Sequence, residues 1–370
     1  MRLEKLHLVN FKNYAEGHLE FKGNLHCFLG KNGSGKTNLL EAIHYLCFTR
    51  GSAPSDDAAT VRHGEPGFRL SGAFEKEGKS WEIACSYFEG KKRMSENGSE
   101  YTRFSEHIGK YPMVWVAPND IELIWTGGEI RRRFFDTLLS QVDREYLSSL
   151  ITYQAQLRQR NSALKMFAER GSVDQDLLDS YDEKLVSTGY LIHQRRKDFI
   201  ASYAPLLAKR YAFLSGQTGE EIELVYDSEL AVKDFATGLK NRLSRDLALG
   251  RTTIGIHRDE IEFNLNGYEL RRYGSQGQQK SFLIGLKLAE FDFLVMHQKT
   301  RPLILLDDIF DKLDDDRIQR LMQLVADGAF RQIFLTDARP ERTREMLKRS
   351  GVEAQMMEVS RNEVREVGGI

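Results

Sequence analysis

The chain of 370 residues is long enough for two or more domains with a large hydrophobic core. Its 41% apolar and 29% charged residues, with only 7 prolines, are typical of a globular protein and exclude disorder as the main state. The 53 basic and 54 acidic side chains leave a formal charge of -1, so any anionic partner must be bound by a local patch.

Cysteine usage and the N-terminal sequence indicate the compartment. Cys27, Cys47 and Cys85 lie in apolar stretches and lack the paired spacing of a zinc site. Charged residues stand at the N-terminus, where a signal peptide needs an apolar run, and no stretch approaches the roughly 18 apolar residues of a membrane span. We therefore predict a cytoplasmic protein without a membrane segment.

The first third of the chain combines strands with one helix. Short alternating runs predict strands over residues 3–9, 18–21 and 25–29, and helical spacing of apolar residues predicts a helix over 38–48. Strand signals return over 68–88 and 112–116. A glycine-rich turn joins the third strand to the helix, which is an α/β arrangement.

The middle of the chain changes character. Between about residues 119 and 216 the apolar residues follow helical spacing, which predicts a helical arm whose recurring aromatic residues pack inside it. Strand signals resume at 222–226 and 253–263, followed by a helix over 279–298 and the apolar run Leu303–Leu306, typical of a buried parallel strand. We predict an α/β (α+β) fold in three segments, 1–118, 119–216 and 217–370, in which the arm is a helical insertion.

The turn after the third strand carries a phosphate-binding motif. Gly30–Thr37 fits G-x-x-x-x-G-K-[ST] at every fixed position. Its glycines let backbone N–H groups surround phosphates, Lys36 would neutralise the β- and γ-phosphates, and the Thr37 hydroxyl would ligate Mg²⁺. The predicted ATP-binding residues here are Gly30, Lys31, Asn32, Gly33, Ser34, Gly35, Lys36, Thr37 and Asn38.

A second acidic site completes the prediction of an ATPase. The apolar run before Asp307 and Asp308 predicts a strand that ends in two carboxylates. Asp307 would hold Mg²⁺ together with Thr37, and Asp308, with Lys36 a predicted catalytic residue, would orient or deprotonate the attacking water. Thr37 and Asp307 are separated by most of the chain, so an insertion must lie between two halves of one site. The helical arm is that insertion.

A third segment resembles the signature turn of ABC-type ATPases. Ser275, Gln276, Gly277 and Gln278 precede an apolar helix and present N–H groups and a hydroxyl at its N-terminus, a second phosphate site. One chain cannot easily wrap both sites around one nucleotide. In ABC-type ATPases the Ser-x-Gly-Gln turn of one subunit closes on the γ-phosphate held by the P-loop of the other.

Nearly end to end, the sequence resembles the RecF family of bacterial recombination-repair ATPases, which are related to the SMC clamps. Besides the P-loop and the signature turn, the segments that carry this resemblance are Leu8–Tyr14, Ala117–Asp120, Arg131–Asp136, Gln159–Asn161, Thr253–Asp259, Leu305–Asp308 and Asp311–Asp314. The resemblance implies an ABC-type ATPase head and an ATP-dependent homodimer. It also implies DNA, with gaps or single-strand/double-strand junctions, as the ligand, and RecR and RecO as partners.

Four positions depart from what the resemblance leads us to expect. Asn119 replaces a glutamate in a segment near the nucleotide, and Ile256 replaces a proline. Asp311 replaces a serine in the segment that ends at Asp314, the residue that by resemblance couples two active sites. Thr336 stands where transporter-type ABC proteins have a switch histidine. The roles of Asp311 and Thr336 stay open at this stage.

Basic and imidazole side chains have two interpretations each. Arg131, Arg132 and Arg133 either contact DNA phosphates or form an ordinary solvated helix face. Lys91–Arg93 is flanked by acidic residues in a predicted hairpin and is interpreted as a surface turn. His257 is interpreted as a hydrogen-bonded structural histidine rather than a functional one.

The predicted function is that of a DNA-repair switch. ATP would bridge two heads, the dimer would close on DNA and help to load a recombinase, and slow hydrolysis would release the DNA. One alternative is the ATPase subunit of a membrane transport complex, which the long arm does not favour. The other is an ATP-gated protein scaffold without a role in DNA binding.

Overall fold

The computed structural model describes residues 1–51, 56–217, 219–311 and 313–369, without the side chains of Asp311 and Gly369. The chain divides into two compact units. The first unit comprises residues 1–120, 213–216 and 280–370, and the second comprises 121–212 and 217–279.

An antiparallel six-stranded sheet with the order β2-β1-β4-β5-β6-β7 forms one layer of the first unit. In β1, Leu6 and Leu8 are buried while His7 between them faces the other side, as the alternation of side chains along a strand requires. Its strands are β1 (Arg2–Phe11), β2 (Tyr14–Glu20), β4 (Gly67–Lys76), β5 (Lys79–Phe88), β6 (Lys91–Glu96) and β7 (Ser99–Glu100).

A second six-stranded sheet with the order β15-β14-β3-β13-β12-β8 is parallel except at β15. The strands β3, β8, β12 and β13 are buried along their whole length, which explains their nearly continuous apolar sequences. The strands are β3 (Leu25–Leu29), β8 (Met113–Val116), β12 (Leu303–Leu306), β13 (Ile333–Asp337), β14 (Gln355–Ser360) and β15 (Glu363–Gly369).

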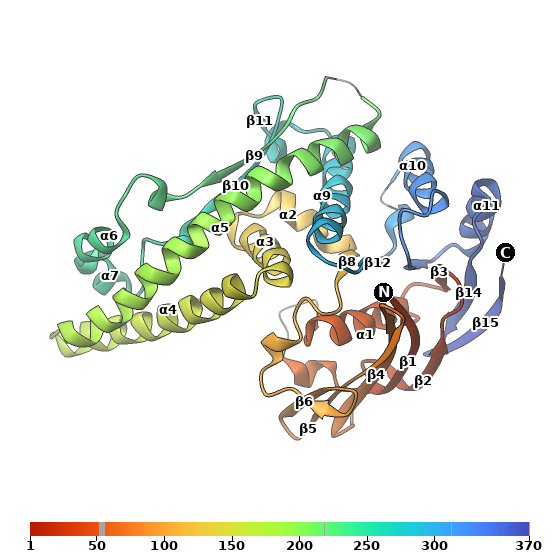
Figure 1. Cartoon of the computed structure of the whole chain (residues 1–370), viewed down its shortest axis with the longest axis horizontal. Coiled ribbons are helices and arrows are strands. Elements are labelled where there is room, and N and C mark those ends of the chain that lie inside the picture. Colours follow the sequence, from red (N-terminus) through yellow and green to blue (C-terminus); the bar gives the residue numbers. More distant parts are fainter. Residues whose placement is uncertain (52–55, 218, 312, 370) are drawn as a thin grey trace. The chain divides into compact units, whose positions relative to one another are not determined.

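The helix α1 (Lys36–Phe48) packs against strands of both sheets and joins them into one core (Figure 1). Leu39, Leu40 and Ile43 of α1 are fully buried in that core. The crossovers β12–β13 and β13–β14 run through α10 (Asp315–Ala326) and α11 (Pro340–Ser350), as parallel neighbours require. The long helix α9 (Gln276–His297) belongs to this unit from residue 280 onward.

The second unit is built on two long helices. The helices α4 (Arg144–Arg170) and α5 (Gln175–Ser215) run side by side in Figure 1. Ion pairs join Arg160 to Asp182 and Arg195 to Asp143, so the two helices are antiparallel. Gly171 ends α4 with φ +69°, a left-handed conformation that favours glycine at a helix C-terminus. The prediction of a helical arm is therefore confirmed at the level of its elements.

Short helices and a small sheet complete the second unit. The sheet has the order β11-β10-β9 and is antiparallel. These elements are β9 (Ile222–Asp227), β10 (Glu260–Leu265), β11 (Tyr268–Glu269), α2 (Glu122–Trp125), α3 (Gly128–Val142), α6 (Phe235–Asn241), α7 (Leu243–Leu249) and α8 (Leu270–Tyr273).

The second unit differs from the predicted arm in its extent. The sequence assigned everything from residue 217 onward to the head, whereas residues 217–279 cluster with the arm. The buried Arg131 guanidinium of α3 donates to the carbonyl of Ile261 in β10, which attaches this sheet to the helices. Strand periodicity identifies a strand but not the unit that it joins, which is why the sequence alone assigned this segment to the head.

Other expectations concern burial. All three cysteines are buried free thiols, and burial raises their pKa, to about 12 for Cys27 and Cys85. In the arm Phe135 and Tyr153 are buried, as predicted for core aromatics. Among the described residues, no helix is both long enough and apolar enough to cross a membrane.

Candidate functional site

The P-loop motif lies between β3 and α1, at the carboxyl end of a central parallel strand. Gly33 and Gly35 have φ +77° and +106°, which side chains with a Cβ rarely adopt. The Lys36 ammonium lies over the loop and donates to the carbonyls of Gly30 and Lys31 at 2.9 and 3.1 Å. The loop therefore has the backbone curvature that a phosphate chain requires, and its own carbonyls hold the Lys36 ammonium.

The turn between β1 and β2 covers this loop. The Tyr14 hydroxyl donates to the Gly35 carbonyl at 3.1 Å, and Asn38 donates its amide to Asn13 at 2.6 Å. A Cβ on Gly35 would lie 2.5 Å from the Asn13 amide nitrogen, so this close approach also requires glycine. Asn13 and Tyr14 entered the sequence analysis only through the family resemblance, because no local pattern places them beside the P-loop.

Three neighbouring strand ends meet at one carboxylate. The Thr37 hydroxyl donates to Asp307 Oδ1 at 3.0 Å, and the Thr336 hydroxyl donates to the same oxygen at 2.7 Å. Asp307 directly follows β12, Thr336 lies near the end of β13, and Thr37 lies in the first turn of α1, after β3. The strands β3, β13 and β12 are adjacent in the parallel sheet. Burial raises the pKa of Asp307, whereas the two hydroxyl donors lower it. The structure thus brings Thr37 and Asp307 together, as the sequence required of a shared magnesium site.

Asp308 and Thr336 form the rest of this edge. The backbone N–H of Asp308 donates to the Thr336 hydroxyl at 2.9 Å, and Asp308 has φ +45°, a left-handed conformation uncommon outside glycine. Thr336 is fully buried, and its hydroxyl links the Asp307 carboxylate to the backbone N–H of Asp308. The neighbouring Asp337 accepts from Thr343 and Arg342 and ties β13 to α11.

A buried charge cluster lies beside the end of β8 and was not recognised in the sequence. Lys287 of α9 is 3.4 Å from Asp120 and 3.8 Å from Glu290. Burial raises the pKa of Glu290 to about 7, an effect that the Lys287 ammonium partly opposes. The available signal was Lys287 and Glu290, three positions apart on a largely apolar stretch of the helix.

The signature turn, residues 275–278, belongs to the second unit. Ser275 and Gln278 form a capping box, in which the Gln278 N–H donates to the Ser275 hydroxyl at 3.2 Å. The Ser275 N–H donates in return to the Gln278 side chain at 2.7 Å. The Ser275 hydroxyl therefore lies at the N-terminus of α9, where the helix dipole favours an anion.

The expectation for the arginine cluster needs correction. Arg131 is buried, with 6% of its surface exposed, and its guanidinium donates to the carbonyls of Leu123, Ile124 and Ile261. Arg132 is half-buried and donates to the carbonyl of Asp259, whereas Arg133 is exposed. Consecutive residues on a helix point in different directions, so three arginines in a row cannot share one face. Arg131 is unavailable to DNA phosphates in this structure.

The sequence analysis missed a set of arginines that does converge. A pocket of about 290 Å³ in the second unit is lined by Arg242, Arg245, Arg251 and Arg258. Arg242 pairs with Glu229 at 2.5 Å, but among the described residues no carboxylate pairs with the other three arginines. A pocket with this excess of guanidinium groups suits a phosphate. The signal was four arginines within seventeen residues, which a residue-by-residue search for motifs passes over.

Buried side chains of the arm hold the segment that carries this pocket. Arg160 donates to Asp246 and Thr252 at 2.7 and 2.8 Å. His257 is held by the Tyr153 hydroxyl at 2.8 Å and the Thr252 carbonyl at 3.1 Å, and burial lowers its pKa to about 4. His257 is thus a structural histidine, as the sequence predicted.

The segment Asp311–Asp314 is described only in part. Lys312 lies outside the described residues, as does the side chain of Asp311. Asp314 caps α10, because its carboxylate accepts from the Arg317 N–H at 3.0 Å and pairs with the Arg317 guanidinium. These contacts show Asp314 as a helix cap, and its coupling of two active sites stays a prediction from the resemblance.

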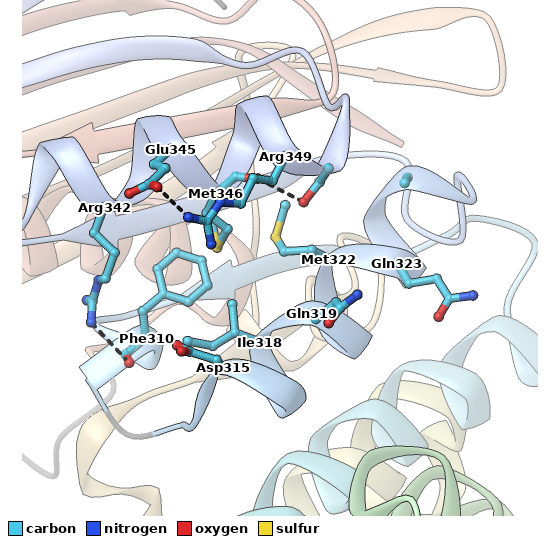
Figure 2. Close-up of a pocket in the computed structure, with 12 residues that line it drawn as sticks. Phe310, Asp315, Ile318, Gln319, Met322, Gln323, Arg342, Glu345, Met346 and Arg349 are labelled. Carbon is cyan, nitrogen blue, oxygen red and sulfur yellow. Dashed lines mark hydrogen bonds and ion pairs between the residues drawn. The ribbon is translucent and has the colours of Figure 1, made fainter.

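A cavity of about 630 Å³ lies between α10 and α11 (Figure 2). Figure 2 shows Phe310, Ile318 and Met322 opposite Met346 and Arg349, and Arg342 donates to the Phe310 carbonyl at 3.3 Å. No residue of the P-loop, and neither Asp307 nor Thr336, is among its lining residues. The nucleotide motifs therefore do not belong to this cavity.

Comparisons with known proteins cover nearly the whole chain. A family model described as an AAA domain matches residues 5–201. The DNA replication and repair protein RecF of Flavobacterium johnsoniae is 41% identical over 94% of this chain and 97% of its own length. The corresponding protein of Cytophaga hutchinsonii is 39% identical over 99% and 97%.

Solved structures give the same result. A structure titled "Structure of the recombination mediator protein RecF-ATP in RecFOR pathway" matches with a TM-score of 0.88 and 30% identity over 99% of this chain and 97% of that one. The Smc head bound to the C-winged helix domain of ScpA matches with a TM-score of 0.58 at 14% identity, which shows a shared fold alone. The head is thus an ABC-type P-loop ATPase fold, and the chain belongs to the family of the DNA replication and repair protein RecF.

Proposed function

We propose that this protein is an ATPase of recombinational DNA repair that binds Mg²⁺ and ATP at Gly30–Thr37, dimerises and closes on DNA. The observation that carries the proposal is the meeting of Thr37, Asp307 and Thr336 at one carboxylate oxygen. Thr37 is far from Asp307 and Thr336 in the chain, and the adjacency of β3, β13 and β12 in the parallel sheet supports their meeting. The full-length similarity to RecF proteins, one of them solved with ATP, supports the same function.

The residues present fit Mg²⁺. Thr37 and Asp307 offer two hard oxygen donors 3.0 Å apart, directly beside the loop that would hold the phosphates. Mg²⁺ usually keeps several waters and binds through one or two protein oxygens plus substrate phosphates. When bound, Mg²⁺ would neutralise the charge that develops on the transferred phosphoryl group. Thr336 would fix the orientation of Asp307 during that step.

The protein's own groups carry the remaining chemistry. Lys36 would turn from the loop carbonyls to the β- and γ-phosphates, where its charge stabilises the leaving group. Asp308 would orient the attacking water and accept its proton. We propose that hydrolysis is slow and coupled to dimerisation, because the site lacks a γ-phosphate clamp until a second subunit supplies one.

That clamp is the Ser275–Gln278 turn of a second copy. Its hydroxyl and N–H groups stand at the N-terminus of a 22-residue helix, which suits the γ-phosphate of an ATP held by the other subunit. ATP would then be buried between two heads, and the dimer would last until hydrolysis. Slow hydrolysis would set the lifetime of the DNA complex.

For DNA, the arginine pocket of the second unit replaces Arg131 as the proposed contact. Arg245, Arg251 and Arg258 are exposed and pair with no carboxylate among the described residues. DNA phosphates would supply their negatively charged partners. The exposed Arg133 stays in the proposal as a peripheral contact, and half-buried Arg132 as a weaker one. We propose gapped duplex or a single-strand/double-strand junction as the preferred DNA, with RecR and RecO as protein partners in the cytoplasm and recombinase loading as the outcome.

The test is DNA binding by the full chain with and without Mg-ATP, measured by fluorescence anisotropy at several salt concentrations. We expect binding that requires ATP, weakens steeply with salt, and is lost in Lys36→Met. Absence of DNA binding would favour the protein scaffold, and DNA binding that is independent of ATP would contradict the proposed ATP-driven closure. Recruitment to membrane vesicles in place of DNA would favour the transporter subunit.

A further inference from the structure

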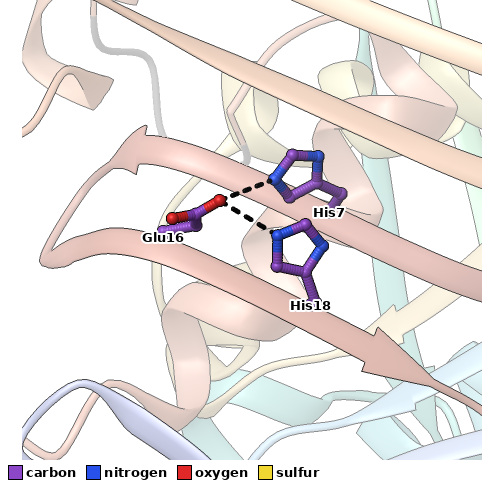
Figure 3. A group of neighbouring side chains, drawn as sticks. All are labelled: His7, Glu16 and His18. Atoms are coloured by element: carbon purple, nitrogen blue, oxygen red, sulfur yellow. Dashed lines mark hydrogen bonds and ion pairs between the residues drawn. The ribbon is translucent and has the colours of Figure 1, made fainter.

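Three side chains that no part of the proposed ATPase uses gather on the hairpin of β1 and β2. In the strand register His7 lies opposite His18, and Val9 lies opposite Glu16. Because side chains alternate along a strand, His7, Glu16 and His18 all project from one face (Figure 3). The buried Leu6 and Leu8 project from the other face, toward α1. The cluster is therefore separated from the P-loop by the thickness of the sheet.

The donor atoms converge. The Nε2 atoms of His7 and His18 lie 3.6 and 3.0 Å from the same oxygen, Oε1 of Glu16. The three ligand atoms all lie within 4.8 Å of one another. The two imidazole rings are stacked, with centroids 3.8 Å apart and 16° between their planes. Both rings turn Nε2 toward the same carboxylate, as Figure 3 shows. Because parallel rings have parallel in-plane lone pairs, the exposed His18 ring would rotate for both nitrogens to bind one ion.

The donor types select a class of metal. Two imidazoles and one carboxylate suit zinc and its neighbours in the first transition row, whereas Ca²⁺ and Mg²⁺ prefer oxygen ligands. Ligands at about 2.0 to 2.1 Å from a tetrahedral ion are about 3.3 Å apart. The ligand atoms of the cluster lie within 4.8 Å of one another, which is slightly wider than this spacing. About 65% of the Glu16 and His18 side chains is accessible, so both can rotate to bring their ligand atoms closer together.

The position of the His7 ring suits a metal ligand. The Nε2 atom of His7 is shielded from solvent, and Oε1 of Glu16, at 3.6 Å, lies just beyond hydrogen-bond distance from it. This atom is oriented for a ligand that would lie between it and Glu16.

We propose that His7, Glu16 and His18 form a binding site for one divalent transition-metal ion of the Zn²⁺ type, with water at the fourth position. The ion would cross-link the edge strand β2 to β1. The same hairpin ends in the turn of Asn13 and Tyr14, which lies on the P-loop. Metal binding would therefore stiffen the hairpin that covers the nucleotide loop. The proposal does not depend on the ATPase or DNA function.

The test is a titration of the metal-free full chain with Co²⁺, without nucleotide, followed by displacement with Zn²⁺. We expect one tight site per chain with the visible absorption of four-coordinate Co²⁺. His18→Ala and Glu16→Gln should each weaken it roughly tenfold or more, because each removes one of three protein ligands. Both residues are exposed, so both variants should fold.

Two controls separate this site from other metal ligands. His63→Ala removes an exposed histidine outside the cluster, and Asp307→Asn removes the proposed magnesium ligand. Both should keep the Co²⁺ site and its affinity. In thermal unfolding, Zn²⁺ should raise the Tm of the wild type and of both controls, and should raise that of His18→Ala by less. The proposal is overturned if Co²⁺ binds with equal affinity in His18→Ala and in the wild type, or if no stoichiometric site is found.

Discussion

The two units use charged side chains in opposite ways. In the first unit the carboxylates at the end of β12 lie at a sheet edge beside a phosphate-binding loop, and two hydroxyls hold Asp307 in place. In the second unit the buried arginines serve the fold. Arg196 is 2% exposed, and it contacts Asp136 through two hydrogen bonds as well as Asp259 and the Ile256 carbonyl.

A charged residue in the sequence indicates function more strongly at some positions than at others. A carboxylate after a buried parallel strand has few structural roles, so its motif indicates chemistry. An arginine in a helical arm has many structural roles, because its five donors can bind carbonyls and carboxylates of several segments. The functional arginines of the arm are therefore expected among those without such partners.

The largest effect should come from Asp308. We expect Asp308→Asn to lower single-turnover ATP hydrolysis by roughly 10²- to 10⁴-fold while ATP affinity stays near the wild-type value, because a general base acts only in the chemical step. Rapid-quench measurements check the rate, and equilibrium binding of a fluorescent ATP analogue checks the affinity. Asp316→Asn, at an exposed position in the first turn of α10, is the matched control and should leave hydrolysis unchanged. Equal loss in both variants would contradict the role of Asp308.

The next largest effect concerns the buried arginine of the arm. Arg196→Leu should lower the free energy of unfolding by about 3 to 5 kcal/mol, because it leaves Asp136 and Asp259 buried without their partner. Its neighbour Arg195 is half-exposed and pairs with Asp143 and Glu145, so Arg195→Leu should cost less than about 1 kcal/mol. Urea unfolding monitored by circular dichroism measures both. Similar values for the two variants would remove the distinction between structural and exposed arginines.

Glu290 tests whether the first unit also contains a structural ion cluster. Its pKa is raised to about 7 by burial, so the folded state holds a proton that the unfolded state loses near pH 4.5. The stabilisation from this group is complete below about pH 4.5 and is lost as the pH rises through about 7. Relative to Glu290→Gln, the wild type should lose about 1 to 3 kcal/mol across that window. Thermal unfolding of both proteins at several pH values checks this, and parallel curves would contradict it.

The smallest effect is expected for single arginines of the pocket. Arg258→Ala should weaken DNA binding and reduce the slope of log affinity against log salt by about one, because one phosphate contact is removed. Arg349→Ala, at an exposed position on α11 paired with Glu345, is the control and should leave the slope unchanged. Fluorescence anisotropy over a range of salt concentrations measures the slope. An unchanged slope in the double variant of Arg245 and Arg258 would exclude this pocket as the DNA contact.

Sequence reasoning predicted the elements of the head well, because its patterns are local. The P-loop, the run before Asp307 and the alternation in β1 each follow from a few neighbouring residues. What the sequence could not predict depends on tertiary packing. Residues 217–279 join the arm through contacts such as that of Arg131 with Ile261, and Asn13 reaches the P-loop through a hairpin turn. The burial of Arg131 and the convergence of four arginines in one pocket likewise require the fold.

The central claim is that two heads share ATP between the P-loop of one and Ser275 of the other. Sedimentation mass of the full chain with Mg-ATP and short gapped duplex tests it most directly, beside Lys36→Met and Ser275→Arg. We predict that ATP converts wild-type monomer to dimer, that DNA joins only the dimer, and that each variant alone stays monomeric. A protein that remains monomeric under every condition and still hydrolyses ATP would contradict the shared site.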